Sequence, residues 1–437
     1  MRGKLNLFQA MMLRWRDLHP YVAVHMVSIA HPLDAAKLKA HIAQRLEAAG
    51  LTGLSLDHRR KRFAFLGGPA AVELTLLPGG DDPPAAAKTE IERQLNCPFP
   101  REGAFTPFRF FAIDGRTTFQ FGLAYDHFIA GGDSIAVLLE KLVAGYGPCA
   151  AESGAPWTPR RYPRTYSRLF LRDLGYTVRG LARLPSMAAS CRRSCRAPCR
   201  TDRAATNAFL SFRVPPAELA ALLRTAKDWG VTLNDVFLAM LLQALAPVVP
   251  RRTGSDTRTE LGVASIVNLR GEFESDANDT FGQFLTSLRV SHPLPPGVGL
   301  HQLASAVHAQ TERIKNDKLY LQTLLALAWT GLAWRFLTEE RRRRFLAKHY
   351  AIWAGMTSLH VDPLWRGPTA SGVPPEYTRA VPTGPLAPMV FAITTFRGAM
   401  HLGVSFRIAD LSRETVERVS TAFLGQVHDL VCFHERC

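Results

Sequence analysis

The chain of 437 residues is longer than one ordinary hydrophobic core requires, which favours two domains or two related halves. Its composition, 47% hydrophobic and 9% aromatic, excludes an intrinsically disordered protein. The net charge is +16, and residues 158–203, with 12 Arg and two Asp, account for +10 of it. The remainder is only mildly basic, which argues against a nucleic-acid-binding protein.

The sequence predicts alternating helices and strands in the first half. A helix is expected at residues 5–15, a strand at 21–29 and, after Asp34, a helix at 35–49. The elements expected next are strands at 62–66 and 72–77, a helix at 85–95, strands at 108–113 and 118–125 joined by an Asp-Gly turn, and a helix at 134–146.

The composition changes between about residues 149 and 205, where Arg, Pro and Ser are frequent and only 166–184 has helical periodicity. This pattern predicts a basic linker with one amphipathic helix, so the expected division is residues 1–150, a linker at 151–205, and residues 206–437. In the last part the expected elements are strands at 210–214, 262–268, 285–290, 356–361, 389–395 and 400–407, and helices at 216–229, 232–248, 300–319 and 412–432. Both halves end on a hairpin followed by a helix, which indicates two related α+β subdomains.

Seven cysteines do not form paired C-x-x-C sets, so neither a disulfide framework nor a structural zinc site is predicted. Cys191, Cys195 and Cys199 recur every fourth residue, but Pro198 interrupts a helix there and no fourth metal ligand is evident. We therefore expect no metal site.

The expected location is the cytoplasm, because the N-terminal pattern is not that of a signal peptide. The apolar stretch 321–334 is shorter than the roughly 20 residues of a spanning helix. A buried core helix and an interfacial helix are both open there, so peripheral contact with a membrane through 158–203 or 321–344 stays an alternative.

The most informative stretch is Tyr125 to Ser134, which places His127 between an apolar strand pattern and a helix pattern. Imidazole can take and return a proton near neutral pH. Gly131 and Gly132 allow a tight turn or the close approach of a ligand. A hydrogen-bonded structural histidine is the competing interpretation.

Four patterns together resemble the chloramphenicol acetyltransferase-like, coenzyme A-dependent acyltransferases, which include condensation domains, wax ester synthases and polyketide-associated acyltransferases. Their signature H-H-x-x-x-D-G-x-S reads Asp126-His127-Phe128-Ile129-Ala130-Gly131-Gly132-Asp133-Ser134. The other three, in chain order, are Thr232-Leu233-Asn234-Asp235-Val236, Val267-Asn268-Leu269-Arg270 followed by Phe281-Gly282-Gln283, and Met356-Thr357-Ser358-Leu359.

The resemblance implies an α+β fold in which two such subdomains form a pseudo-dimer with a tunnel between them. It implies His127 as the general base, supported by the loop residues Asp126, Gly131, Gly132, Asp133 and Ser134. It also makes Asn268, Arg270, Thr357 and Ser358 structural or tunnel-lining candidates. No permanently bound cofactor is implied, and a coenzyme A or phosphopantetheine thioester would be the co-substrate.

The motif departs from the family pattern at two positions: its aspartate is Gly131 and its first histidine is Asp126. In the family that aspartate pairs with an arginine, so Arg270 lacks its expected partner, and either Asp133 or Asp126 could replace it.

The leading hypothesis is a stand-alone acyltransferase that uses an acyl-CoA or an acidic acyl carrier protein as donor and a small hydroxyl or amine compound as acceptor. The basic charge suits either donor. The alternative, motivated by Gly131, is a non-catalytic relative that recruits a carrier protein or partner enzyme.

Overall fold

The computed structural model describes residues 1–57, 60–115, 117–143, 146, 157–160, 166–200, 206–250, 258–273, 280–293, 297–365 and 376–436. The elements of the first half are, in chain order, β1 (Arg2–Lys4), α1 (Leu7–Leu18), β2 (Val22–Ile29), α2 (Ala35–Ala48), β3 (Leu54–Asp57), β4 (Arg62–Phe65), β5 (Leu74–Pro78), α3 (Pro83–Asn96), β6 (Ala104–Phe105), β7 (Phe108–Gly115), β8 (Thr118–Asp126) and α4 (Gly132–Val143).

The rest of the described chain forms a second set of strands and helices. In chain order its elements are α5 (Ser167–Arg172), α6 (Leu174–Ala182), α7 (Leu184–Arg193), β9 (Asn207–Val214), α8 (Pro216–Asp228), α9 (Leu233–Leu245), β10 (Leu261–Asn268), η2 (Arg270–Glu272), β11 (Leu285–His292), α10 (Leu300–Asn316), α11 (Tyr320–Ala333), η4 (Trp334–Phe336), α12 (Glu339–His349), β12 (Ala354–His360), β13 (Tyr377–Ala380), β14 (Met389–Phe396), β15 (Ala399–Arg407) and α13 (Arg413–Arg436).

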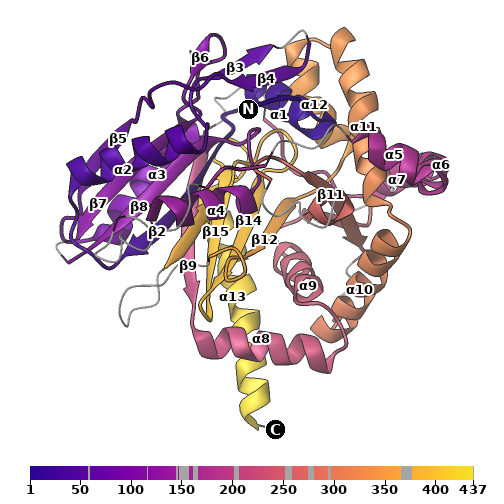
Figure 1. The fold of residues 1–437 in the computed structure, drawn as a ribbon. Helices are drawn as coiled ribbons and strands as arrows, with labels where there is room; N and C mark the ends of the chain where they lie inside the picture. The colour runs from indigo at the N-terminus through magenta and orange to yellow at the C-terminus, as the bar shows by residue number, and fades with distance from the viewer. Residues whose placement is uncertain are drawn as a thin grey trace.

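Two mixed sheets organise the molecule (Figure 1). The first has the strand order β13-β2-β8-β7-β5, and the second has the order β11-β10-β12-β14-β15-β9. A smaller antiparallel sheet, β1-β4-β3-β6, lies at the N-terminal end. The expected alternation of strands and helices is therefore present in both halves, and each half ends on a hairpin followed by a helix.

Strand β13 joins the two halves, because it follows β12 in the chain but pairs with β2 of the first sheet. The register places Arg379 opposite His25, and β2 in turn pairs with β8 along its whole length. A segment of the second half thus forms the edge of the first sheet, where β2 separates it from β8, the strand that ends at the signature motif.

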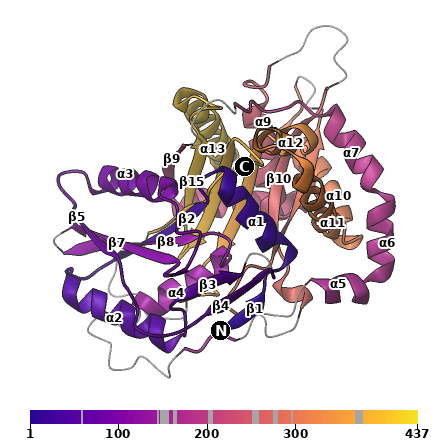
Figure 2. The same cartoon turned by 90° about the horizontal axis from the view of Figure 1, so that it is seen from above.

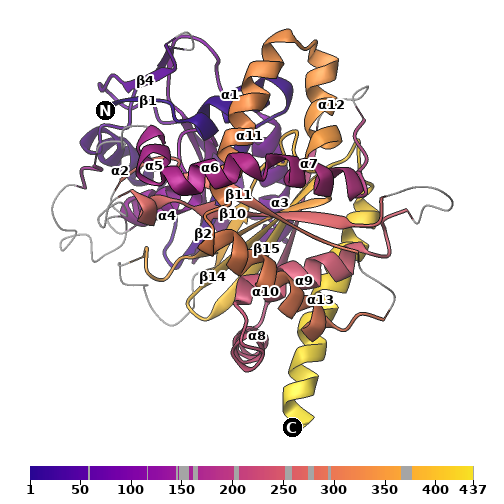
Figure 3. The ribbon, with the colours of Figure 1, turned by 90° about the vertical axis from the view of Figure 1, so that its right-hand side faces the viewer.

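The middle of the chain differs from the expectation of one helix at 166–184. Three consecutive helices, α5 to α7, extend the helical region to Arg193. The helix axis breaks at Asp173 and Arg183, and Pro185 is accommodated in the first turn of α7, where it needs no hydrogen-bond acceptor. Figures 2 and 3 show these helices along the outside of the second half, where α6 contacts α11.

Helix α11 consists mostly of apolar residues, but only some of them are buried. Tyr320, Leu321, Leu324 and Leu327 are buried, whereas Trp329 near its end is 64% exposed. The stretch is therefore a core helix over its first turns only. Within the described part of the chain, no helix is both long enough and apolar enough to cross a membrane.

Candidate functional site

His127 lies immediately after β8, where the strand turns into the loop before α4. Its backbone N–H donates to the carbonyl of Tyr21 (3.2 Å), so the residue continues the β2 pairing by one position. Side chains alternate along a strand, which places Tyr125 and His127 on one face and Asp126 on the other. Tyr125 and His127 accordingly line a cavity, and Asp126 does not.

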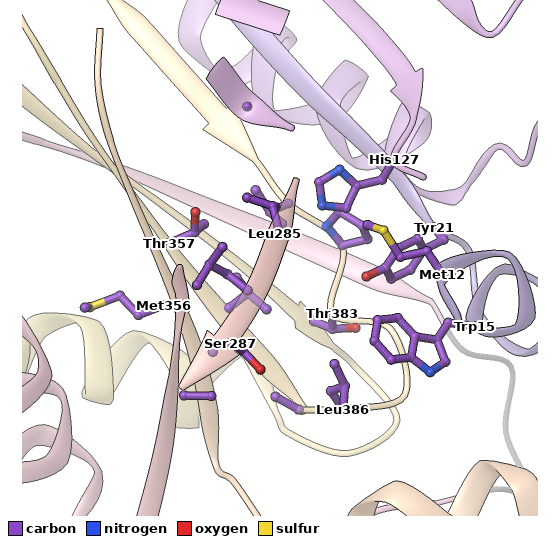
Figure 4. Close-up of a pocket in the computed structure, with 18 of the residues that line it drawn as sticks. Met12, Trp15, Tyr21, His127, Leu285, Ser287, Met356, Thr357, Thr383 and Leu386 are labelled. Carbon is purple, nitrogen blue, oxygen red and sulfur yellow. The ribbon is translucent and has the colours of Figure 1, made fainter. Parts of the chain in front are cut away.

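The cavity has a volume of about 90 Å³ and lies between the two main sheets. In Figure 4, His127 and Tyr21 of the first half face Leu285 and Thr357 of the second half. Most of its lining is apolar or aromatic, and its other lining residues include Phe8, Met12, Trp15, Ala264, Ile266, Ile352, Met356, Val381, Leu386 and Val390.

His127 is a neutral imidazole at physiological pH. Its side chain is buried, and this burial, reinforced by the positive charge of Arg379, lowers its pKa to about 3. The ring packs at 5.5 Å from the ring of Tyr21 and at 5.7 Å from that of Tyr125, measured between centroids. Its Nδ1 atom has no hydrogen-bond partner among the described residues. A neutral ring retains one unprotonated nitrogen, which can accept a proton from a hydroxyl or an amine.

Asp126, at the position of the signature's first histidine, is turned into the protein. It is 1% exposed and forms an ion pair with Arg16 of α1. Burial raises its pKa to about 6, although the guanidinium of Arg16 opposes that rise. The pair fastens the end of β8 to α1, so Asp126 supports the backbone that presents His127.

Asp133 is the carboxylate that pairs with Arg270. Asn268 donates to Asp133 through Nδ2 (2.9 Å) and accepts the backbone N–H of Arg270 through Oδ1 (3.0 Å). Arg270 also donates from Nη2 to the hydroxyl of Ser134 (2.5 Å) and to the carbonyl of Gly282 (3.1 Å). Residues of the second half thereby hold the start of α4. They do so through Asp133, which lies two positions after Gly131, the place of the signature aspartate.

Gln283 and Gly282 hold the other side of the same loop. The side-chain amide of Gln283 donates to the carbonyl of His127 (3.0 Å), and the backbone N–H of Gly131 donates to the carbonyl of Gly282 (2.9 Å). Asn6 donates to the backbone carbonyl of Gln283 (2.7 Å), which adds the N-terminal cap of α1 to this network. The path of the loop is thus fixed by three separate parts of the chain.

The two glycines of the loop are needed for close approach. A Cβ atom on Gly131 would lie 2.8 Å from Oδ1 of Asp133 and 2.9 Å from Oε1 of Gln283. One on Gly132 would lie 3.1 Å from Nη1 of Arg379. Gly131 therefore leaves room for the carboxylate of Asp133, and Gly132 leaves room for a guanidinium in the cavity.

The remaining expected site residues fall into two groups. Thr357 lines the cavity, and its backbone carbonyl accepts a hydrogen bond from Arg379 (3.0 Å). Ser358 points to the other face of β12, where its hydroxyl lies 3.4 Å from Oδ1 of Asn234, and it does not line the cavity. Asn268 and Arg270 belong to the network around Asp133 and are likewise absent from the lining.

The polar residues of the site that were missed in the sequence include His25, Tyr377 and Arg379. His25 is fully buried, with Nδ1 2.7 Å from the hydroxyl of Tyr377, and burial holds its pKa well below the usual range. Its place in the alternating pattern of the strand at 21–29 could have marked it. No local signal marks Arg379, because its position depends on the pairing of β13 with β2.

No group of three or more His, Cys, Asp or Glu side chains suited to a metal ion occurs in the ranges that the structure describes. The polar groups that line the cavity include the imidazoles of His25 and His127, the hydroxyls of tyrosine, serine and threonine, and the guanidinium of Arg379.

No protein-family model and no curated protein match the chain. Solved structures match it over nearly its whole length. One is the first condensation domain of the calcium-dependent antibiotic synthetase in complex with a substrate analogue, with a TM-score of 0.67, 18% identity, and coverage of 99% of this chain and 97% of that chain.

Two further structures give a similar result. The starter condensation domain of the rhizomide synthetase RzmA, a point mutant in complex with C8-CoA, has a TM-score of 0.66 at 14% identity, covering 99% of this chain and 95% of the other. The epimerization domain from the third module of tyrocidine synthetase B has a TM-score of 0.66 at 11% identity, covering 99% and 96%. The protein has the α+β fold of condensation and epimerization domains, which confirms the fold expected from its sequence.

Proposed function

We propose that this protein transfers an acyl group from a coenzyme A or acyl-carrier-protein thioester to a hydroxyl or amine acceptor, with His127 as the general base. The observation that carries the proposal is the neutral imidazole of His127 on the wall of a largely apolar cavity between the two main sheets. The fold supports it as well, because one matching structure is described as a complex with C8-CoA.

The proposed reaction needs one proton carrier. As the acceptor oxygen or nitrogen bonds to the thioester carbonyl carbon, its proton moves to the free ring nitrogen of His127. Collapse of the tetrahedral intermediate breaks the C–S bond, and the protonated imidazole returns the proton to the departing thiolate. The products are the ester or amide and the free thiol, and His127 is neutral again. General-base catalysis of this kind contributes about 10²–10⁴-fold to the rate.

The alternative of a non-catalytic recruiter was suggested by Gly131, at the place of the signature aspartate. Asp133 pairs with Arg270 in its stead, so the loop that presents His127 is fastened without a carboxylate at position 131.

The deciding experiment compares thiol release from a panel of acyl-CoA and acyl-carrier-protein donors by the wild-type protein and by His127→Ala. We expect the variant to lose at least about 10²-fold in turnover. The matched control is His401→Gln, since His401 is also buried but lies outside the cavity. Equal rates for wild type and His127→Ala would exclude the proposed base, and binding of a carrier protein without turnover would favour the recruiter.

A second candidate role is attachment to an anionic membrane surface. It is favoured by apolar side chains that are exposed on the outer helices of the second half of the molecule. On α11 and η4, Trp329, Leu332 and Phe336 are 64%, 50% and 83% exposed, beside the exposed Arg335. On the neighbouring α5 and α6 the exposed apolar residues are Leu171, Leu174, Val178 and Leu181. Exposed aromatic and basic side chains together suit the interface of an anionic bilayer.

A further inference from the structure

Arg379 is a buried cation in the cavity that the proposed proton transfer does not use. It lies on β13, opposite His25 of β2, and is 3% exposed. It is the one side chain with a permanent charge among the residues that line this cavity, since His25 and His127 are kept neutral by burial.

The guanidinium is held by neutral acceptors. Nε donates to Oγ1 of Thr394 (2.8 Å), and Nη2 donates to the backbone carbonyls of Thr357 (3.0 Å) and Ile393 (2.7 Å). These three bonds fix its plane and leave Nη1 without a hydrogen bond to any described residue. Nη1 is the nitrogen that lies 3.1 Å from the place of a Cβ on Gly132, so it is directed toward the loop that carries the base.

No carboxylate within the described residues forms an ion pair with Arg379. The charge of Asp133 does raise the pKa of Arg379, but the carboxylate of Asp133 is bonded to Arg270 and Asn268 instead. Burying a cation without an anionic partner is costly, and its charge is compensated most effectively by an anion that enters with hydrogen-bond acceptors of its own.

We propose that Arg379 binds the carboxylate of the acyl acceptor, so that the acceptor is a hydroxy acid or an amino acid whose hydroxyl or amine faces His127. This inference rests on the proposed acyl transfer and names its acceptor class. A carboxylate fits better than a phosphate because one nitrogen with two N–H groups is free and no second cation lines the cavity.

The two residues are also coupled electrostatically. The positive charge of Arg379 is one of the causes that depress the pKa of His127. A carboxylate paired with Arg379 would cancel that charge and make His127 a stronger base. Binding of an acceptor of the right class would thus activate the group that removes its proton.

The test is equilibrium binding by calorimetry, which does not depend on turnover. The probes are 2-hydroxybutanoate and 2-aminobutanoate together with the amide of each. We expect both acids to bind to the wild-type protein and to His127→Ala, and to bind at least about 30-fold more weakly to Arg379→Gln. The amides should bind more weakly than the acids to wild type and equally to wild type and Arg379→Gln.

A second variant guards against misfolding of Arg379→Gln. Gly132→Ala keeps the cation but places a methyl group 3.1 Å from Nη1, and it should weaken binding of the acids several-fold without affecting the amides. The inference is overturned if no acid binds to wild type, or if Arg379→Gln or Gly132→Ala binds the acids as wild type does. It is also overturned if Arg379→Gln slows transfer to acids and amides equally without changing affinity, which would indicate that Arg379 stabilises the oxyanion. Acid binding without any thioester turnover would instead contradict the proposed function alone.

Discussion

Asp133 at the start of α4 and Arg270, the first residue of η2, form an ion pair that fastens the loop of His127 to the second half of the chain. The acyltransferase signature that this motif resembles has its carboxylate two residues earlier, where this chain has Gly131. A Cβ on Gly131 would lie 2.8 Å from Oδ1 of Asp133, so side chains at the two positions would occupy the same space. The carboxylate that pairs with Arg270 is supplied from position 133 in this chain.

The ion pair should be required for stability. In Asp133→Asn the guanidinium of Arg270, whose side chain is 5% exposed, would stay buried without its anion, and we expect a loss of about 3–5 kcal/mol in the free energy of unfolding. Urea denaturation of wild type and variant measures the difference. A change below about 1 kcal/mol would mean that solvent or Ser134 already compensates Arg270.

The matched control moves the carboxylate from position 133 to position 131. Gly131→Asp alone should destabilise the protein, because its new carboxylate crowds that of Asp133 and both would compete for Arg270. The double variant Gly131→Asp/Asp133→Gly should be more stable than either single variant, because one carboxylate then occupies the shared volume. Additive losses in the double variant would show that the loop has been rebuilt around position 133.

Much of the fold could be predicted from the sequence because local signals mark it. The Asp-Gly signal for a hairpin, Asp34 before α2 and Thr232 before α9 identify elements that the structure contains, although Asp114 and Gly115 are paired with β8 as the last residues of β7 and do not form the turn itself. The strands missed were β1, β3 and β6 of the small sheet and β13 of the first sheet, because two to four residues are too few to show alternation. Helix α12 was missed because it is polar on nearly all sides and has no apolar stripe.

The site could be predicted where its residues fall within local motifs, as His127 and Thr357 do. His127, Asp133 and Ser134 lie in one motif, and the partnership of Asp133 with Arg270 was one of two alternatives that the sequence left open. Arg379 could not be found in this way. Its approach to His25 depends on β13 crossing to the first sheet, a pairing between residues more than 350 positions apart.

The depressed pKa of His127 makes a prediction about acid stability. The folded protein binds a proton at this site with a pKa of about 3, and the unfolded chain with one of about 6.5. The folded state is therefore favoured above pH 6.5 and loses about 1.4 kcal/mol for each pH unit between 6.5 and 3, since only the unfolded state is protonated there. The stability difference between pH 7.5 and pH 5 should be smaller by about 2 kcal/mol in His127→Gln than in wild type.

Urea denaturation at the two pH values provides this measurement. His19 has a lowered pKa too and contributes equally in both proteins. The lowered pKa of His25 is caused mainly by burial and Arg379 and least by His127, so its contribution changes little and the comparison reports on His127. An identical pH dependence in wild type and His127→Gln would mean that the imidazole is hydrated in the folded protein and titrates normally.

The position of Arg379 should also depend on Gly403 of β15. A Cβ on Gly403 would lie 2.0 Å from the backbone oxygen of Arg379 and 3.0 Å from Cε2 of Phe209. Because the first contact is with backbone, Gly403→Ala should displace β13 and cost about 1–3 kcal/mol in the free energy of unfolding. The control is Gly425→Ala on α13, which meets nothing within 4 Å and should be neutral or stabilising. Equal effects of the two substitutions would show that β13 can shift without strain.

The exposed apolar residues of α11 and η4 make a prediction about membranes. The wild-type protein should float with vesicles that contain phosphatidylserine at low salt, and binding should fall as salt screens the arginines. The triple variant Trp329→Ser/Leu332→Ser/Phe336→Ser should bind much less, because it loses the apolar side chains that enter the interface. Leu223→Ser on α8, where the leucine is 53% exposed, is the matched control and should bind as wild type does. If the triple variant floats as well as Leu223→Ser at every salt concentration, the surface of α11 and η4 is not the membrane contact.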